Sequence, residues 1–122
     1  MCTKKDSNKS YKVFLATATA LMLLGVILGA FGAHGLKDIL EPKIFNAYQT
    51  GITYHFYHTI GLFIVLIFAK LFVYNKLIIS IIYTLLFGIL LFSGSLYLYS
   101  ITSIKIFAMI TPIGGLLFIV AW

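Results

Sequence analysis

The stretch "VFLATATALMLLGVILGAFG", Val13 to Gly32, decides the fold, because it carries no charge over twenty consecutive positions. A helix needs about 20 apolar residues to cross the roughly 30 Å of hydrocarbon in a bilayer. Three further apolar stretches follow at residues 58–73, 78–99 and 106–122, and the last is short for a full crossing. Backbone groups in lipid must be paired within helices or closed barrels, and the alternating strands of a barrel are absent from the sequence. The predicted fold class is therefore all-α, a four-transmembrane-helix membrane bundle.

The overall composition excludes an ordinary soluble domain. The 122 residues are 61% hydrophobic and only 10% charged, and their mean hydropathy is +1.06. A soluble domain carries roughly 25% charged residues to cover its surface. Most of the surface must therefore face lipid, and residues 13–122 are predicted to form one integral membrane domain.

The positive charge predicts how the chain is oriented. The net charge of +6 comes from nine lysines, which lie only at the edges of the apolar stretches, where cations anchor helices against anionic headgroups. Nucleic acid is therefore not an expected partner. One side of the membrane receives six of the lysines (Lys4, Lys5, Lys9, Lys12, Lys70, Lys76) and the other side receives three (Lys37, Lys43, Lys105). The excess predicts that both termini are cytoplasmic, in the inner or plasma membrane of a cell.

The N-terminal region leaves two alternatives open. Residues 1–12 are polar and predict a disordered cytoplasmic tail. A cleaved signal peptide is the alternative for the first apolar stretch, but that stretch exceeds the about 7 to 15 residues usual for one. The single cysteine, Cys2, excludes an intrachain disulfide and leaves lipid attachment as a second alternative.

The segment "LEPKIFNAYQTGITYHFYH" predicts local structure between the first two crossings. Pro42 suits the first turn of a helix. Beyond it, apolar residues recur at helical spacing (Ile44, Phe45, Tyr48, Ile52). This pattern predicts a short amphipathic interfacial helix that leads into the second crossing, with a bend at Gly51.

Three histidines form the most suggestive polar set. His34, His55 and His58 all fall on the predicted outer side, and the last two share one face of a helix because they are three residues apart. With Lys37 and Asp38 they make a candidate polar site. Two such imidazoles can bind a metal if a third ligand arrives, whereas the alternative is an aromatic belt at headgroup level. No metal ligand set and no cofactor is predicted.

Small residues are predicted to form helix-packing faces. Alanine and glycine spaced four apart let another backbone approach closely, and Gly32 with Gly35 is expected to end the first helix so that His34 can reach its neighbours. An alternative is that Ser93, Ser95 and Thr111 line a polar path. The candidate packing positions are Gly25, Gly29, Gly32, Gly94, Gly114 and Gly115.

These observations predict a binding role. No nucleophile elbow, phosphate loop, paired carboxylates or zinc-protease motif occurs in the sequence, so an enzyme is not predicted. The favoured function is a structural or accessory bundle that binds membrane lipid or a membrane partner, including a second copy of the chain. The alternatives are a channel or carrier for a small solute, ion or proton that uses the histidines, and a metal-binding membrane protein.

Four motifs resemble one known family. They are "GAFGAHGL" (Gly29 to Leu36), "FNAYQTGITYHFYH" (Phe45 to His58), "LFSGSLYL" (Leu91 to Leu98) and "TPIGG" (Thr111 to Gly115) followed by Trp122. In this order they resemble the YgdD-like family, small inner-membrane proteins of unknown function with relatives among eukaryotic transmembrane proteins. The resemblance implies four helices, histidines at the positions of His34 and His58, and no catalytic assignment. Members usually extend past this tryptophan, so we expect the last helix to be incomplete.

Overall fold

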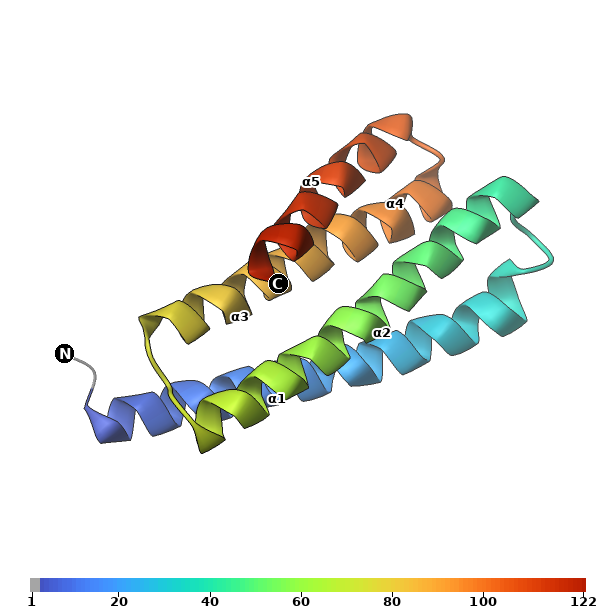
Figure 1. The fold of residues 1–122 in the computed structure, drawn as a ribbon. Coiled ribbons are helices and arrows are strands. Elements are labelled where there is room, and N and C mark those ends of the chain that lie inside the picture. The colour runs from blue at the N-terminus through green and yellow to red at the C-terminus, as the bar shows by residue number, and fades with distance from the viewer. Residues whose placement is uncertain (1–2) are drawn as a thin grey trace.

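The computed structural model describes residues 3–122, and no strand occurs among them. The elements are α1 (Lys4–Phe31), η1 (Gly32–Leu36), α2 (Pro42–Leu71), α3 (Lys76–Ile89), η2 (Leu90–Gly94), α4 (Ser95–Thr102) and α5 (Lys105–Ala121). The two η elements are π-helical turns that continue a helix without breaking it. The all-α prediction is confirmed, with four rods in Figure 1 formed by α1–η1, α2, α3–η2–α4 and α5. The lipid attachment considered at Cys2 lies outside the described residues.

Three of the four rods are long and apolar enough to cross a bilayer. They are Lys4–Leu36, Pro42–Leu71 and Lys76–Thr102, whose mean hydropathies reach 2.3, 1.6 and 2.4. The fourth, α5, has 17 residues, and at 1.5 Å per residue it spans only about 25 Å. Pro112 lies inside α5 without ending it. The prediction that the last helix is short for a full crossing therefore agrees with the structure.

The first helix begins much earlier than the apolar stretch does. The structure differs from the expected disordered tail, because residues 4–12 belong to α1. Thr3 and Asp6 form a capping box in which the Thr3 oxygen accepts the Asp6 N–H at 3.3 Å and the Asp6 carboxylate accepts the Thr3 N–H at 3.4 Å. Because the spanning segment already supplies a formed helix, extending it to this cap needs no new nucleation.

A separate interfacial helix before the second crossing is not confirmed. The helix α2 has 30 residues and runs unbroken from Pro42 through Gly51. After Pro42 the helix contains no proline that would remove a backbone hydrogen bond. A Cβ atom at Gly51 would lie 3.0 Å from the Tyr97 ring and 3.2 Å from Leu96 Cβ. This glycine therefore serves close packing of α2 against α4 and not a bend.

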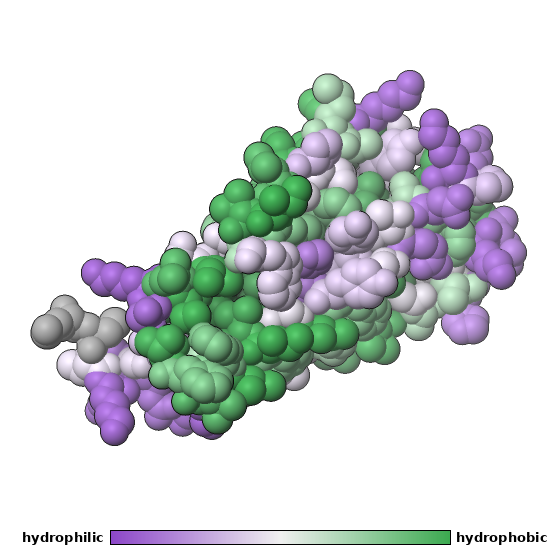
Figure 2. Space-filling view, viewed as in Figure 1, coloured by the Kyte–Doolittle hydropathy of each residue, from purple (hydrophilic) through white to green (hydrophobic). Residues whose placement is uncertain are grey.

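The helix α2 is the centre of the bundle. It packs against α1 on one side and against the α3–η2–α4 rod on the other, while α5 packs on that rod. The core is apolar and includes residues from four helices (Phe14, Ala18, Leu62, Leu66, Ile82, Leu85, Phe118). Hydrophilic residues gather at the two ends of the elongated molecule in Figure 2, and apolar residues cover much of its middle. This distribution is the one that a bilayer requires.

Candidate binding sites

His55 is a buried polar link between three helices. Its side chain on α2 is 1% exposed, with Nε2 at 2.7 Å from the Leu21 carbonyl oxygen of α1 and Nδ1 at 2.9 Å from the Tyr97 hydroxyl of α4. A carbonyl oxygen can only accept, so Nε2 carries the hydrogen and Nδ1 accepts from the Tyr97 hydroxyl. Both nitrogens of a neutral imidazole are therefore satisfied, and His55 has no free atom for a metal.

Two glycines of the α1–η1 rod leave backbone carbonyls of α1 open to α2. Gly25 follows Leu21 by four residues, and a Cβ there would lie 3.4 Å from the His55 ring. In the same way Gly32 follows Leu28 by four residues, and Tyr48 of α2 donates its hydroxyl hydrogen to the Leu28 carbonyl oxygen. A Cβ at Gly32 would lie only 2.4 Å from the Tyr48 ring. Small residues here let side chains of α2 reach the backbone of α1.

The other candidate packing glycines fall into two groups. Gly114 lies directly against η2, since a Cβ there would be 2.3 Å from the Phe92 backbone nitrogen. By contrast, a Cβ would have ordinary contacts of 3.7 to 3.8 Å at Gly29, Gly94 and Gly115. Close backbone approach therefore requires glycine at position 114 and not at positions 29, 94 and 115.

The candidate polar site is not assembled at one place. His34, Lys37 and Asp38 are exposed, in η1 and the turn that follows. No group of three or more His, Cys, Asp or Glu residues that could hold a metal occurs in residues 3–122. His55 and His58 lie 13 and 16 residues after the start of α2 at Pro42, near its middle and not at its outer end. They were expected near the interface because the second crossing was predicted to begin only at His58, after a separate interfacial helix.

The hydroxyls considered for a polar path join helices instead. Ser93 is fully buried and donates to the Gly51 carbonyl oxygen of α2 at 2.6 Å. Ser95 Oγ lies 2.8 Å from the Phe92 carbonyl oxygen and 2.6 Å from Thr111 Oγ1 on α5. Each hydroxyl therefore has a protein partner, and these contacts hold η2 to α2 and α4 to α5.

A first groove lies between α1 and the α3–η2–α4 rod. Its volume is about 310 Å³. The polar side chains that line it direct their hydrogens to protein acceptors, as Thr17 does to the Val13 carbonyl oxygen. The groove therefore presents hydrocarbon and fits an apolar chain. Its lining residues are Thr17, Leu21, Leu24, His55, Leu86, Ile89, Leu90, Ser93, Gly94 and Tyr97.

A second groove, which we name the His58 groove, lies between α2 and α5. His58 is 8% exposed, and its ring stacks on Phe118 with centroids 3.4 Å apart and planes inclined by 6°. The His58 Nδ1 atom lies 2.9 Å from the Tyr54 carbonyl oxygen one turn earlier. The volume of the groove is about 710 Å³, and it is lined by Tyr54, His58, Phe92, Pro112, Gly115, Leu116, Phe118, Ile119 and Trp122.

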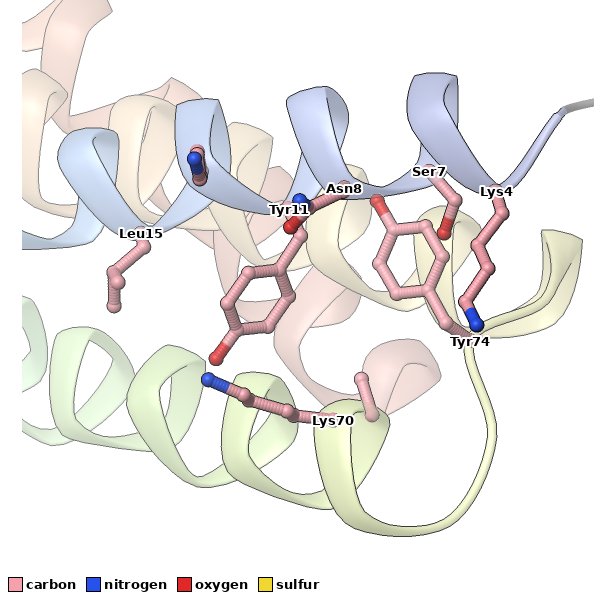
Figure 3. Close-up of a pocket in the computed structure, with 9 residues that line it drawn as sticks. Lys4, Ser7, Asn8, Tyr11, Leu15, Lys70 and Tyr74 are labelled. Carbon is pink, nitrogen blue, oxygen red and sulfur yellow. The ribbon is translucent and has the colours of Figure 1, made fainter.

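A third pocket, which we name the lysine pocket, lies where α1 begins and α2 ends. Figure 3 shows the labelled side chains of α1 and Lys70 of α2 directed toward a common space. Lys70 Nζ lies 5.7 Å from the centroid of the Tyr11 ring, a distance typical of a cation–π contact. The pocket has a volume of about 430 Å³ and is lined by Lys4, Ser7, Asn8, Tyr11, Lys12, Leu15, Ala69, Lys70 and Tyr74.

Sequence reasoning missed several of these residues. The lysines were expected at helix ends, but their convergence depends on α1 extending back to Lys4 beside the end of α2. Tyr97 was quoted only within a motif and Tyr48 was read only as part of an apolar stripe, although a tyrosine in a membrane helix needs a partner for its hydroxyl. That requirement was the available signal for the contacts they make with His55 and with the Leu28 carbonyl.

Comparison with known proteins gives a consistent result. The family described as protein of unknown function (DUF423) matches residues 28–115. The chain is 43% identical over 111 residues to the UPF0382 membrane protein YwdK of Bacillus subtilis (strain 168), covering 91% of this chain and 90% of that protein. It is 33% identical over 100 residues to the UPF0382 inner membrane protein YgdD of Escherichia coli (strain K12), covering 80% of this chain and 73% of that protein. No solved structure matches it.

Proposed function

This chain belongs to the DUF423 family and is a membrane protein, as its resemblance to the YgdD-like proteins predicted, and from this premise we propose that it binds anionic phospholipids at the lysine pocket. The proposal gives the chain an accessory binding role in the membrane and no catalytic one. It rests on one observation, the convergence of three lysines from two helices on a single pocket. The charges, the neighbouring donors and an adjoining apolar surface each support it.

The charge of the pocket suits a phosphate group. Lys4, Lys12 and Lys70 line it, and no carboxylate does so among the described residues. Ser7 and Asn8 add neutral hydrogen-bond donors beside the lysines. A lysine near an anionic membrane surface contributes about 1 kcal/mol to binding. Three lysines around one pocket should therefore favour an anionic headgroup over a zwitterionic one.

An apolar surface continues from the lysine pocket along the outer face of α1. This surface is hollowed into a shallow groove of about 500 Å³, which shares Lys12 and Leu15 with the lysine pocket. Thr19 on this surface donates its hydroxyl hydrogen to the Leu15 carbonyl oxygen of its own helix, so it leaves no free donor. The remaining lining residues are small or apolar (Ala16, Ala20, Leu23). A lipid whose phosphate occupies the lysine pocket would place an acyl chain on this apolar surface of α1.

The proposal includes an orientation. The lysine pocket lies at the end of the bundle that carries six of the nine lysines, which supports placing that end on the cytoplasmic side of the cell membrane. The cytoplasmic leaflet is also the one that carries a negative surface potential in many membranes. In a variant whose native cysteine is removed by Cys2→Ser, a cysteine introduced at an exposed N-terminal position should then react with a thiol reagent only after the membrane is permeabilised.

Lipid binding can be measured on the purified protein in detergent. Phosphatidylglycerol and phosphatidylcholine with matched acyl chains are titrated at low salt, and bound lipid is counted by native mass spectrometry. The triple variant Lys4→Gln, Lys12→Gln, Lys70→Gln should lose about 100-fold in affinity for phosphatidylglycerol, from about 1 kcal/mol for each lysine. Raising the salt concentration should weaken wild-type binding, because ions screen the attraction.

The matched control removes the same charge at the opposite end. The variant Lys37→Gln, Lys43→Gln, Lys105→Gln has the same net charge as the first triple variant, but none of its lysines lines the pocket. It should bind phosphatidylglycerol like the wild type. Equal losses in the two triple variants would show attraction by total charge alone, and equal wild-type affinity for the two lipids would contradict the proposal outright.

A further inference from the structure

His58 holds an unpaired nitrogen deep in the bundle. Its side chain is more than nine-tenths buried, at 8% exposure. Nδ1 must carry the hydrogen, because its partner at 2.9 Å is the Tyr54 carbonyl oxygen, which can only accept. In the neutral ring, Nε2 then bears a lone pair. In residues 3–122, every side-chain nitrogen or oxygen that is fully enclosed has a hydrogen-bond partner. His58 Nε2 has no partner among these residues, so it is not fully enclosed and must open onto free space.

That space is the His58 groove, whose walls are largely aromatic. Phe118 covers one face of the imidazole, and Tyr54, Phe92 and Trp122 contribute further rings. Tyr54 and Phe92 already pack on each other with centroids 4.5 Å apart. The groove thus combines the buried Nε2 acceptor with several ring faces and edges.

The groove is open to lipid near the middle of a spanning helix. Ile119 and Leu116, which line it, are 75% and 60% exposed. Trp122 lies against Gly61, where a Cβ would come within 2.7 Å of the indole ring, so the end of α5 rests on the middle of α2. A histidine at this depth is costly unless it is paired or functional.

We propose that the His58 groove binds a lipophilic phenol, that is, a molecule with an aromatic hydroxyl group and an apolar tail, such as an alkylated hydroquinone. The phenolic hydrogen would be donated to His58 Nε2, and the ring would pack against the aromatic walls in an offset or edge-on arrangement. The tail would remain in the surrounding hydrocarbon. A ligand with only carbonyl acceptors finds no donor on Nε2, and an anion finds no cation among the lining residues.

The only tryptophan of the chain reports on this groove. Trp122 lines it, so its fluorescence should respond to a bound ring without any added label. Decylhydroquinone, its dimethyl ether and decanol are titrated anaerobically into the protein in detergent, with fluorescence corrected for ligand absorbance and heats measured by calorimetry. The hydroquinone should bind about tenfold more tightly than its dimethyl ether, which has the ring but no hydroxyl hydrogen. Decanol, which has the hydroxyl but no ring, should bind more weakly than the hydroquinone.

Two variants of His58 separate the nitrogen from the ring. His58→Phe keeps an aromatic ring on Phe118 and lacks Nε2, whereas His58→Asn keeps a donor for the Tyr54 carbonyl and also lacks Nε2. Both should bind the hydroquinone no better than its dimethyl ether. Equal binding of the two ligands to the wild type would overturn the proposal without any variant. Unchanged discrimination in either folded variant would overturn it as well.

This site stands apart from the proposed lipid site. The triple lysine variant of the lysine pocket should bind the hydroquinone like the wild type, because no lysine lines the His58 groove. Binding of the phenol that disappeared with those lysines would place it elsewhere on the protein and would contradict the assignment.

Discussion

Replacing Gly114 with alanine should push α5 away from η2. The added Cβ would lie 2.3 Å from the Phe92 backbone nitrogen and 2.7 Å from its Cα, and backbone atoms cannot move aside as a side chain can. Overpacking of this kind costs about 1 to 3 kcal/mol, and contact with backbone favours the upper value. The helix propensity of alanine over glycine returns about 1 kcal/mol. The expected net loss in unfolding free energy is about 2 kcal/mol.

The adjacent glycine supplies the control. A Cβ at Gly115 would lie 3.7 Å from the Phe92 ring, an ordinary contact, so Gly115→Ala should gain up to about 1 kcal/mol from propensity. The two variants should thus differ by about 3 kcal/mol. Unfolding by dodecyl sulfate in mixed micelles, followed by circular dichroism, measures the difference. Equal stability of Gly114→Ala and Gly115→Ala would refute the reasoning, because the two substitutions differ only in what the new methyl group meets.

Three further outcomes are expected. Gly32→Ala should destabilise the bundle in the same unfolding assay by about 1 to 2 kcal/mol, because the new Cβ meets a tyrosine ring at 2.4 Å, whereas Gly29→Ala should not. A double-mutant cycle of Ser95→Ala and Thr111→Ala should give a coupling energy of about 0.6 kcal/mol, the usual value for such bonds in a membrane protein, and a coupling of zero would rule out their hydrogen bond. His55→Phe should increase hydrogen exchange in α1, since it removes a direct bond to the Leu21 carbonyl oxygen, and unchanged exchange would show that this bond does not hold α1.

The spanning helices could be predicted because charge is so costly in hydrocarbon. Four apolar stretches with almost no charge are enough to identify four helices, whatever their packing. Their ends were less accessible to prediction. The early start of α1 depends on a capping box between Thr3 and Asp6, and polar residues such as Asn46 and Gln49 conceal that the helix beginning at Pro42 continues unbroken into the second crossing. Hydropathy alone detects neither cap geometry nor buried polar residues.

The site could be predicted only in part, because residues that share a helix face need not share neighbours. Positions three apart differ by about 60° around a helix axis. That angle is enough to turn His55 toward α1 and α4 and His58 toward α5. Which neighbour each residue meets depends on how the helices pack, and the sequence pattern carries no direct record of that. The lysine pocket was missed for the same reason.

The bonds from His55 and Tyr48 to two α1 carbonyls also bear on assembly. Apolar helices attract one another with little preference for register, whereas these two acceptors lie two turns apart and match only one alignment. Both bonds join residues that are synthesised before α3 begins. The first hairpin therefore contains its own alignment signal, and it could reach its final pairing while the second half of the chain is still being inserted.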